Sequence, residues 1–422
     1  MNFNLPELPD GWTFSVLENC AQKGSISYGV VQPGMAVADG VPMIRVNNFK
    51  EMRIDLSDVM RIAPQIESKY ARTRLAGGEV LLTLVGSVGQ VAIVPTTMAG
   101  FNVARAVAVI HPLSHIEPEW IGLCLRSPLS QHILGSRANT TVQTTINLKD
   151  VRALPIPIPP EKERRQITEM LTKLDDRIAL LRETNITLEA IAQAQFKSWF
   201  VDFDPVHAKL EGREPEGMDD LTSALFPGSL TDSELGNVPT GWRIGNFGDF
   251  INRLSAGKKY DQKSALPVGS VPILDQGKSG TIGFHNDEPS VKASLDSPVV
   301  VFANHTCYMR LISYDFSAIQ NVLPFVGKDV DIVWAYFATK DRVKFSEYKG
   351  HWPDFAIEKA IIPSLATTIA YRVLIDPMIR RIRLNEMLAQ TLTDLRDMLL
   401  PRLISGQLQM PDAEDELHEV LN

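Results

Sequence analysis

The residues that could carry out catalysis or bind a metal are few in this chain. His111 and His115 have the spacing of metal ligands on a helix, but Pro112 would interrupt the helix that aligned them. The sequence contains no GxxxxGK phosphate loop, no GxGxxG turn, no GxSxG nucleophile elbow and no HExxH zinc motif. It also lacks the Asn/Asp-Pro-Pro-Tyr/Phe motif of amino methylation. We therefore expect no metal site and no catalytic centre.

The nearest approach to a catalytic cluster is a carboxylate–lysine pattern of the nuclease kind. Such a site needs one residue between the acid and the lysine, so that both lie on one face of a strand. Glu347 and Lys349 have this spacing, with Asp341 upstream, whereas Asp354 and the adjacent pair Glu358-Lys359 do not. Because a Glu-x-Lys triplet arises by chance in most chains of this length, an enzyme with its own nuclease centre is the weaker alternative.

Several polar loops instead combine cations, amides and hydroxyls, as surfaces that bind nucleic acid do. Arginine pairs with the edge of guanine, asparagine and glutamine pair with that of adenine, and tight glycine turns let backbone N–H groups approach a phosphate. Any single loop of this kind also fits an ordinary solvated surface, but their occurrence in both halves of the chain favours a nucleic-acid interface. The candidate DNA-binding residues are Lys69, Arg72, Arg74, Ser87, Arg105, Arg137, Asn139, Thr141 and Gln143, followed by Lys258, Lys259, Lys278, Asn304, His305, Lys349 and His351.

The chain contains an internal repeat. The distance between matching positions falls steadily from 230 to 204 residues along the sequence, as expected when a second copy keeps the plan of the first with shorter loops. The matches, in order, are Pro9-x-Gly11-Trp12 with Pro239-x-Gly241-Trp242, Val80–Leu82 with Val299–Val301, Trp120 with Trp334, and Arg177-Ile178-x-Leu180 with Arg381-Ile382-x-Leu384.

Each copy begins with a part that has the signature of β-strands. Short runs rich in Val and Ile are bounded by Gly and Pro, which is typical of strands in a mostly β domain. The runs are Val80–Val85, Val91–Pro95, Val103–Ile110, Pro298–Ala303 and Met309–Tyr314.

Each copy then continues into a long segment with the signature of a helix. Glu161–Phe200 has no internal Gly or Pro, and Pro160 is placed to start a helix. Ala366–Leu400 is its counterpart, interrupted by Pro377, which is expected to shorten or kink this helix. Forty residues would form a rod of about 60 Å.

Apolar positions in both helical segments recur in steps of four and three, which is the pattern of a coiled-coil seam. Two seams in one chain most simply pack on each other, and a buried Asn would fix their register; the alternative is that each helix folds back on its own β domain. The predicted seam residues are Ile167, Leu171, Leu174, Ile178, Leu181, Asn185, Leu188, Ile375, Met378, Ile382, Asn385 and Leu392.

The sequence therefore predicts an α+β fold with two β-rich domains in tandem, separated by two long helices that pack as an antiparallel coiled coil with pseudo-two-fold symmetry. The predicted segments are a first domain at 1–159, a helix at 160–204, an acidic, irregular linker at 205–237, a second domain at 238–365, a helix at 366–404 and an acidic tail at 405–422, expected to be frayed from Pro411 on.

The charge of −8 is concentrated outside the two predicted domains. Residues 1–159 carry 13 Lys and Arg against 12 Asp and Glu, and residues 238–365 carry 14 against 13. Linker and tail together hold 12 acidic and 2 basic residues. Each domain is therefore free to carry a local basic face despite the acidic whole.

Length and composition set further limits. With 422 residues, 44% hydrophobic, the chain can form two or three soluble domains, and no apolar run is long enough for a membrane helix. The N-terminus lacks the features of a secretion signal. Cys20, Cys124 and Cys307 are too far apart for a disulfide framework. We expect a cytoplasmic protein with reduced thiols and no membrane partner.

Taken together, the repeats, helices and linker resemble the specificity (S) subunits of type I restriction–modification enzymes. The likeness runs from the Pro-x-Gly-Trp opening to the segment Leu399–Gly406. Its most specific stretches are Leu188–Gln193, Phe196–Val206 and the linker segments Ala224–Pro227 and Ser233–Gly236. Pro377 is a mild departure from the family pattern.

The resemblance implies a protein without catalytic activity of its own. Each β-rich part would be a target recognition domain that reads one half of a bipartite site in double-stranded DNA. The helices would hold the two domains at a fixed distance and dock two methyltransferase (M) subunits. The resemblance places S-adenosylmethionine, ATP and magnesium in partner subunits, the restriction (R) subunits among them, and no cofactor in this chain. The alternative from another class is a tandem-repeat scaffold that recruits proteins through its coiled coil.

Overall fold

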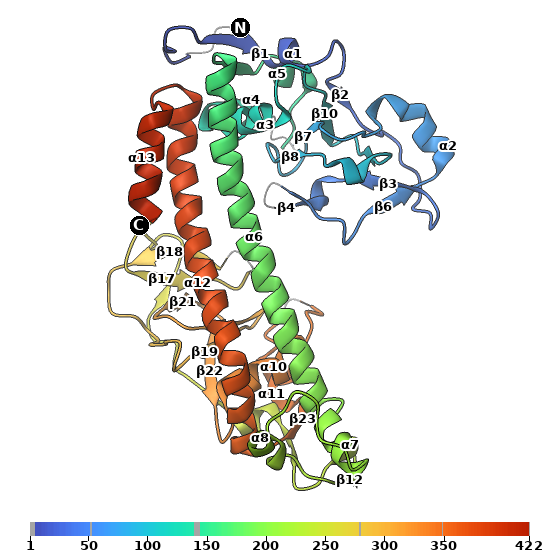
Figure 1. The fold of residues 1–422 in the computed structure, drawn as a ribbon, viewed down its shortest axis with the longest axis vertical. Coiled ribbons are helices and arrows are strands. Elements are labelled where there is room, and N and C mark those ends of the chain that lie inside the picture. Colours follow the sequence, from blue (N-terminus) through green and yellow to red (C-terminus); the bar gives the residue numbers. More distant parts are fainter. Residues whose placement is uncertain (1–4, 51–52, 139–143, 278–279, 348, 422) are drawn as a thin grey trace. The chain divides into compact units, whose positions relative to one another are not determined.

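The computed structural model describes residues 5–50, 53–138, 144–277, 280–347 and 349–421. Their contacts divide the chain into unit 1, residues 1–179 and 389–422, and unit 2, residues 180–388. Both boundaries fall inside the two long helices, α6 (Glu161–Phe200) and α12 (Leu365–Ile404) (Figure 1). Each unit therefore combines one β-rich part with a portion of each helix, whereas the sequence-based boundaries give each helix a segment of its own.

Unit 1 contains two small sheets. One has the strand order β2 (Ser27–Tyr28), β10 (Val107–Ile110), β7 (Val80–Thr83) and β8 (Val91–Ile93), and the other β6 (Met60–Ile62), β3 (Val41–Ile44) and β9 (Asn102–Val103). β1 (Thr13–Val16) pairs with β11 (Pro155–Ile158), the strand that leads into α6. The smaller elements are α1 (Leu17–Cys20), α2 (Pro64–Glu67), the 3-10 helix η2 (Ser68–Thr73), α3 (Pro118–Arg126), α4 (Pro128–Arg137), α5 (Leu148–Arg152) and the hairpin β4 (Phe49–Lys50) and β5 (Arg53–Ile54).

Unit 2 repeats this plan. Its first sheet has the order β15 (Ile251–Arg253), β22 (Val322–Gly327), β19 (Val299–Ala303) and β20 (Met309–Ile312), which matches β2, β10, β7 and β8 element for element. A second sheet has the order β16 (Lys259–Tyr260), β21 (Ser317–Ile319), β17 (Val271–Leu274) and β18 (Thr281–His285). β14 (Arg243–Asn246) pairs with β23 (Lys359–Ile362), as β1 pairs with β11. α9 (Phe247–Phe250), α10 (Ile332–Thr339) and α11 (Trp352–Ile357) complete the unit.

The apolar runs all contain strands, as predicted; β7, β10 and β19 are central in their sheets, whereas β8 and β20 are edge strands. Every residue of β7, β10 and β19 is buried, and the cores of the two units gather around these strands. A strand covered on both faces has no polar side, which explains why these segments read as continuous apolar runs rather than as an alternating pattern.

α6 begins directly after Pro160, as predicted, with Glu161 and Glu163 in its first turn, where carboxylates are favourable for the helix dipole. It ends at Phe200, where the chain leaves the helical conformation. The N–H groups of Val201 and Asp202 both bond to the carbonyl of Lys197, and Phe203 has the left-handed φ of 57°.

α12 runs through Pro377 without a break, so the expected shortening of this helix was wrong. A proline within a helix deprives the carbonyl four residues earlier of its donor. That residue is Val373, and both Val373 and Pro377 are exposed. Water can therefore satisfy the carbonyl.

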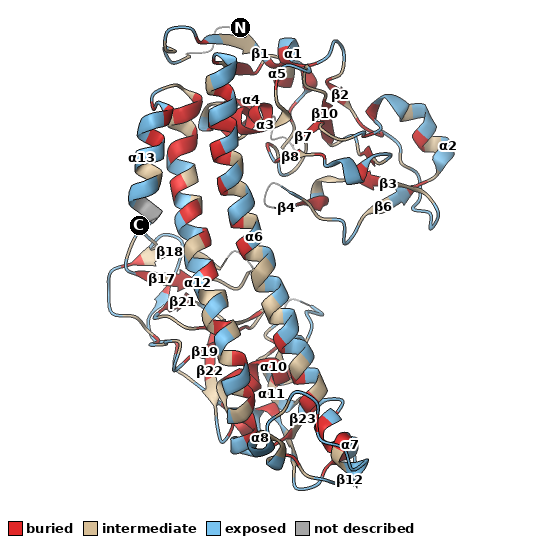
Figure 2. Ribbon diagram, viewed as in Figure 1, coloured by how far each residue is buried: buried red, intermediate tan, exposed pale blue. Residues whose placement is uncertain are grey.

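α6 and α12 pack in opposite directions. In unit 2, Asn185 contacts Asn385 and Ala192 contacts Tyr371, so that positions advance along one helix as they recede along the other. The predicted seam positions are all buried or half-buried (Figure 2). Some of this burial is against the β-rich parts, because Ile375 and Met378 pack into the unit 2 core with Trp334. In unit 2, α12 therefore packs both on α6 and on its own β-rich part, whereas α6 packs there on the β-rich part of the other copy.

The predicted irregular linker contains regular elements. They are α7 (Asp204–Leu210), α8 (Asp220–Ala224) and the hairpin β12 (Leu230–Ser233) and β13 (Gly236–Pro239). Lys209 ties the segment together, because its Nζ donates to the carbonyls of Ser223 and Phe226 at 2.6 and 2.7 Å. The Phe226 ring is buried against Trp199.

The expectation of a frayed tail was also wrong. Residues Met410–Leu421 form helix α13. Arg402 of α12 donates to both carboxylate oxygens of Glu416 at 2.7 and 2.8 Å, and Ala413 is fully buried. An apolar face and a bidentate ion pair outweigh the repulsion among the acidic residues.

The asparagine pair on the helices gives a first prediction. Asn385 Nδ2 donates to Asn185 Oδ1 at 2.8 Å, and Asn185 Nδ2 donates to the carbonyl of Ile382 at 3.2 Å. Asn385→Ala should lower the free energy of unfolding by about 1–2 kcal/mol, because it leaves a half-buried amide oxygen without its donor. Replacing both asparagines by leucine should cost less than the single change.

Denaturant unfolding of the single and double variants measures this difference, with Gln390→Ala on the exposed side of α12 as the control. A double variant that loses as much stability as Asn385→Ala, or more, would contradict the pairing.

Candidate nucleic-acid interface

The three candidate cations before the first Gly-Gly turn have different surroundings. Lys69 and Arg72 are exposed on η2. Arg74 is held by Glu67, donating to both carboxylate oxygens at 2.9 and 2.5 Å, and hydrogen bonds from Arg74 lower the pKa of this buried carboxyl. The N–H groups of the Arg74 guanidinium are therefore engaged within the protein. Lys69 and Arg72 are better placed to bind a phosphate.

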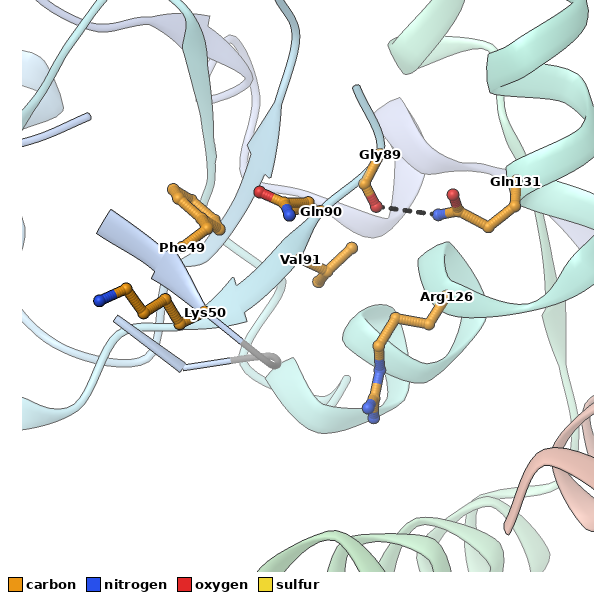
Figure 3. A pocket seen from close by; sticks show the side chains of 7 residues that line it. All are labelled: Phe49, Lys50, Gly89, Gln90, Val91, Arg126 and Gln131. Atoms are coloured by element: carbon orange, nitrogen blue, oxygen red, sulfur yellow. Dashed lines mark hydrogen bonds between the residues drawn. The ribbon is translucent and has the colours of Figure 1, made fainter. Parts of the chain in front are cut away.

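The glycine turn that carries Ser87 is built rigidly. Gly86 N–H bonds to the carbonyl of Thr144, and Gln131 of α4 donates to the carbonyl of Gly89 at 2.9 Å (Figure 3). Gly89 has a φ of +92°, and a Cβ there would lie 2.6 Å from Gln131 Oε1, so this position requires glycine. Ser87 itself is exposed at the tip of the turn.

Arg105 and Arg137 complete the described candidates of the first copy. Arg105 lines an open pocket with Tyr28, Val85 and Asn147, next to the segment that pairs with the Ser87 turn. Arg137 ends α4 and lies 3.7 Å from a carboxylate oxygen of Asp150. Asn139, Thr141 and Gln143 lie outside the described residues.

Four candidates of the second copy meet in one cluster. The Asn304 carbonyl accepts from His351 N–H at 2.8 Å, and Asn304 Oδ1 accepts from Trp352 N–H at 2.8 Å. His305 Nδ1 lies 2.8 Å from the carbonyl of Lys349. His351 is buried, so it supports the loop rather than facing a ligand.

Lys349 belongs to a surface ion-pair group. Its Nζ lies 3.2 Å from Asp354 and 3.3 Å from Glu347, and the hydrogen bond to Asp354 raises the pKa of the lysine. The acids of the nuclease-like pattern therefore neutralise a lysine at the surface. Among the described residues, no group of three or more His, Cys, Asp or Glu side chains is arranged to hold a metal.

Lys258 and Lys259 lie at the edge of another polar network. Lys258 bonds to Asp287 at 2.7 Å, and its ammonium group sits over the ring of Tyr260. Tyr260 stacks on the buried His285 with ring centroids 4.2 Å apart. Lys259 is exposed on β16, and Lys278 lies outside the described residues.

The cysteine thiols offer no nucleophile. All three cysteines are buried and free, and burial raises the pKa of Cys124 well above that of an exposed thiol. They are protonated at neutral pH and act as core residues.

Comparison with known proteins identifies a family that this chain resembles. Residues 34–190 match the family model of the type I restriction modification DNA specificity domain. The EcoBI specificity subunit of Escherichia coli is 32% identical over 198 residues, which is 44% of this chain and 42% of that protein. The HindI specificity subunit of Haemophilus influenzae is 24% identical over 86% of this chain and 92% of that protein.

The chain is similar to the type I restriction–modification specificity subunits. A crystal structure of the S subunit from M. genitalium has the same fold, with a TM-score of 0.51 at 14% identity, covering 96% of this chain and 97% of that one. The family match covers most of the first β-rich part and most of α6. None of the described helices is both long and apolar enough to cross a membrane.

Sequence reasoning missed one cation that the structure places next to the candidates. Arg253 ends β15 and lies over the ring of Trp352 at 5.4 Å from its centroid. No local signal could have revealed this contact, because the two residues are 99 positions apart and meet only through the sheet.

The His285 network predicts a dependence of stability on pH. His285 Nδ1 accepts from the N–H of Asp287 at 3.1 Å, while Nε2 lies 2.8 Å from Ser317 Oγ, so the ring is neutral and donates to the serine. Burial lowers the pKa of His285. Below about pH 6.5 the unfolded chain binds a proton that the folded chain refuses, so stability is full above this pH and falls as the pH drops.

Urea unfolding at pH 7.5 and 5.5 checks this expectation. The loss between the two values should shrink in His285→Gln and stay unchanged in the control His207→Gln, whose side chain is exposed. Asp287 also faces the ring, but because Lys258 lowers its pKa, its titration belongs to a more acidic range. An equal loss in both variants would contradict the neutral-histidine assignment.

Proposed function

We propose that this chain gives a type I restriction–modification complex its DNA sequence specificity, each β-rich part reading one half of a bipartite site. The observation that carries the proposal is the duplication itself. The two parts share one sheet order, and both present exposed cations, Lys69 and Arg72 on η2 in one and Lys259 on β16 in the other. Two related recognition domains in one chain match a DNA site that consists of two half-sites.

The helices are proposed to set the unread spacer between the half-sites. α6 and α12 each contain 40 residues, which corresponds to about 60 Å of helix. The asparagine pair fixes their register, because a slip would leave two amides unpaired. A spacer of fixed length needs such a device.

The helices are also proposed to dock the methyltransferase subunits. Leu180 and Leu384 are matching positions of the repeat, and they are 52% and 57% exposed. Arg177 and Arg381, which also match, are exposed one turn away. Exposed leucines at equivalent positions are the expected signature of a surface that binds two copies of one partner.

The remaining activities belong to the partners. We propose that the methyltransferase subunits bring S-adenosylmethionine, that restriction subunits bring ATP- and magnesium-dependent cleavage, and that the assembly works in the cytoplasm on double-stranded DNA. This chain would recognise the DNA sequence and set the distance between the two half-sites.

Methylome sequencing tests the proposed function. Cells that express this chain with its methyltransferase should carry methyladenine in a bipartite motif, and the motif should vanish when the chain is deleted. A motif that persists without the chain would overturn the proposal.

The leucine pair allows a test of the docking surface. Leu180→Asp and Leu384→Asp should each remove one methyltransferase copy from the purified complex, and the double variant should remove both, because a carboxylate in an apolar interface is left without a partner. Native mass spectrometry measures the subunit count. Leu221→Asp is the control, since Leu221 is 84% exposed on α8. Full occupancy of the double variant would rule out this surface.

A further inference from the structure

An open pocket lies beside the Ser87 turn of the first copy. Its volume is about 520 Å³, and its polar lining residues are Tyr28, Arg105, Thr145 and Asn147. The other lining residues are apolar, Val85 among them, so none of the described residues that line the pocket is acidic. Val85 pairs with Thr145, and the N–H of Gly86 bonds to the carbonyl of Thr144. The pocket therefore borders the turn that carries the exposed Ser87.

Backbone contacts fix the position of Arg105 at this pocket. Its N–H donates to the carbonyl of Val30 at 2.8 Å, and Val30 pairs in parallel with Ala104. A Cβ on Gly29 would lie 2.0 Å from the carbonyl oxygen of Val103, so only glycine lets the Tyr28–Val30 segment come this close. Main-chain contacts thus hold Tyr28 and Arg105 in one pocket, while the Arg105 side chain is exposed.

Three of the polar side chains have hydrogen-bond donors left to use. Within the described parts of the chain, the Arg105 guanidinium has no hydrogen-bond or ion-pair partner, and this group can only donate. Tyr28 Oη accepts from the N–H of Leu148 at 3.3 Å, which leaves its O–H to donate. Asn147 Oδ1 accepts from the N–H of Asp150 at 3.1 Å, which leaves its Nδ2 amide group to donate. One positive charge and two neutral donors suit an anion with several oxygens.

The shape of the site favours a phosphate over the edge of a base. Base edges lie inside a groove and are reached by side chains that protrude into it. Phosphates project from the duplex and can enter a recess, and a phosphodiester has one negative charge and two free oxygens.

We propose that this pocket binds one backbone phosphate of DNA, with Arg105 supplying the charge and Tyr28 and Asn147 the neutral donors. The inference rests on the proposed function and adds to it a phosphate site of the first copy. Such a contact holds the duplex in register without reading its sequence.

The test uses the full chain assembled with its methyltransferase subunits. Binding of a labelled duplex with the bipartite site, and of duplexes with single base-pair changes, is measured by fluorescence anisotropy over a range of salt concentrations. The variants are Arg105→Ala, Tyr28→Phe and Asn147→Asp. Lys23→Ala is the matched control, because Lys23 is an exposed cation of the same unit that does not line the pocket.

Arg105→Ala should weaken binding to every duplex by about tenfold, leave the ratio between sequences unchanged and reduce the slope of log K against log salt by about 0.9. Tyr28→Phe should weaken binding less and leave the slope unchanged, because it removes a neutral donor.

Asn147→Asp separates binding from folding. An aspartate still accepts the N–H of Asp150, so α5 keeps its cap and thermal unfolding should be unchanged. The new carboxylate would stand where the phosphate binds, so this variant should lose at least as much affinity as Arg105→Ala.

Affinities within twofold of the parent for both Arg105→Ala and Asn147→Asp would overturn the phosphate site. An equal loss in Lys23→Ala would overturn it as well, since the effect would then follow net charge alone, and so would a loss confined to one base pair, which would make Arg105 a base reader. The proposed function fails separately. A parent complex that prefers no sequence would refute it, while the salt slope on any duplex would still test the pocket.

Discussion

The contact between α6 and α12 is the constraint on which the rest of the structure depends. In unit 1, Asp175 of α6 is held by Arg396 of α12 at 3.0 Å and by Arg126 of α3 at 2.8 Å. In unit 2, Glu189 of α6 accepts from Tyr336 at 2.8 Å and from Lys340. A carboxylate on the same helix thus ties each β-rich part to the helices. Because Asp175, Arg126 and Arg396 are largely removed from water and Glu189 is half-buried, these bonds resist rotation of each β-rich part against the helices.

In both units the Pro-x-Gly-Trp motif contacts the end of a long helix. In unit 2 the linker connects that helix to the motif along the chain, whereas in unit 1 the helix lies at the other end of the chain. In unit 2 the chain runs from α6 through the linker to Trp242, which packs on Phe200 and Phe203. In unit 1 the corresponding position is reached by the far end of the chain. A Cβ on Gly406, with φ +73°, would lie 2.4 Å from Pro9 Cγ. Only glycine permits this close approach, so the segment after α12 packs directly against the N-terminal segment.

Among the described residues, the cations of the candidate interface divide into those with a carboxylate partner and those without one. Arg74, Lys258 and Lys349 are engaged by Glu67, Asp287 and Asp354, so DNA would have to displace an existing partner. Lys69, Arg72, Arg253 and Lys259 have no such partner among the described residues, and they can bind a phosphate at the cost of losing water alone. Net charge cannot reveal this difference, because paired and unpaired cations count equally in it.

The sequence by itself determined the duplication, the strand runs, the two long helices and the family resemblance, because these depend on periodicity and on motifs that are local in the chain. It could not determine what Pro377 or the acidic tail would do. Those outcomes depended on the exposure of Val373 and on the Arg402–Glu416 pair, which only the folded chain brings about. The same holds for the candidate interface. Residue types indicated polar loops, but His351 proved buried, Arg74 proved paired, and Arg253 entered through Trp352, since tertiary contacts decide which charge is left facing solvent.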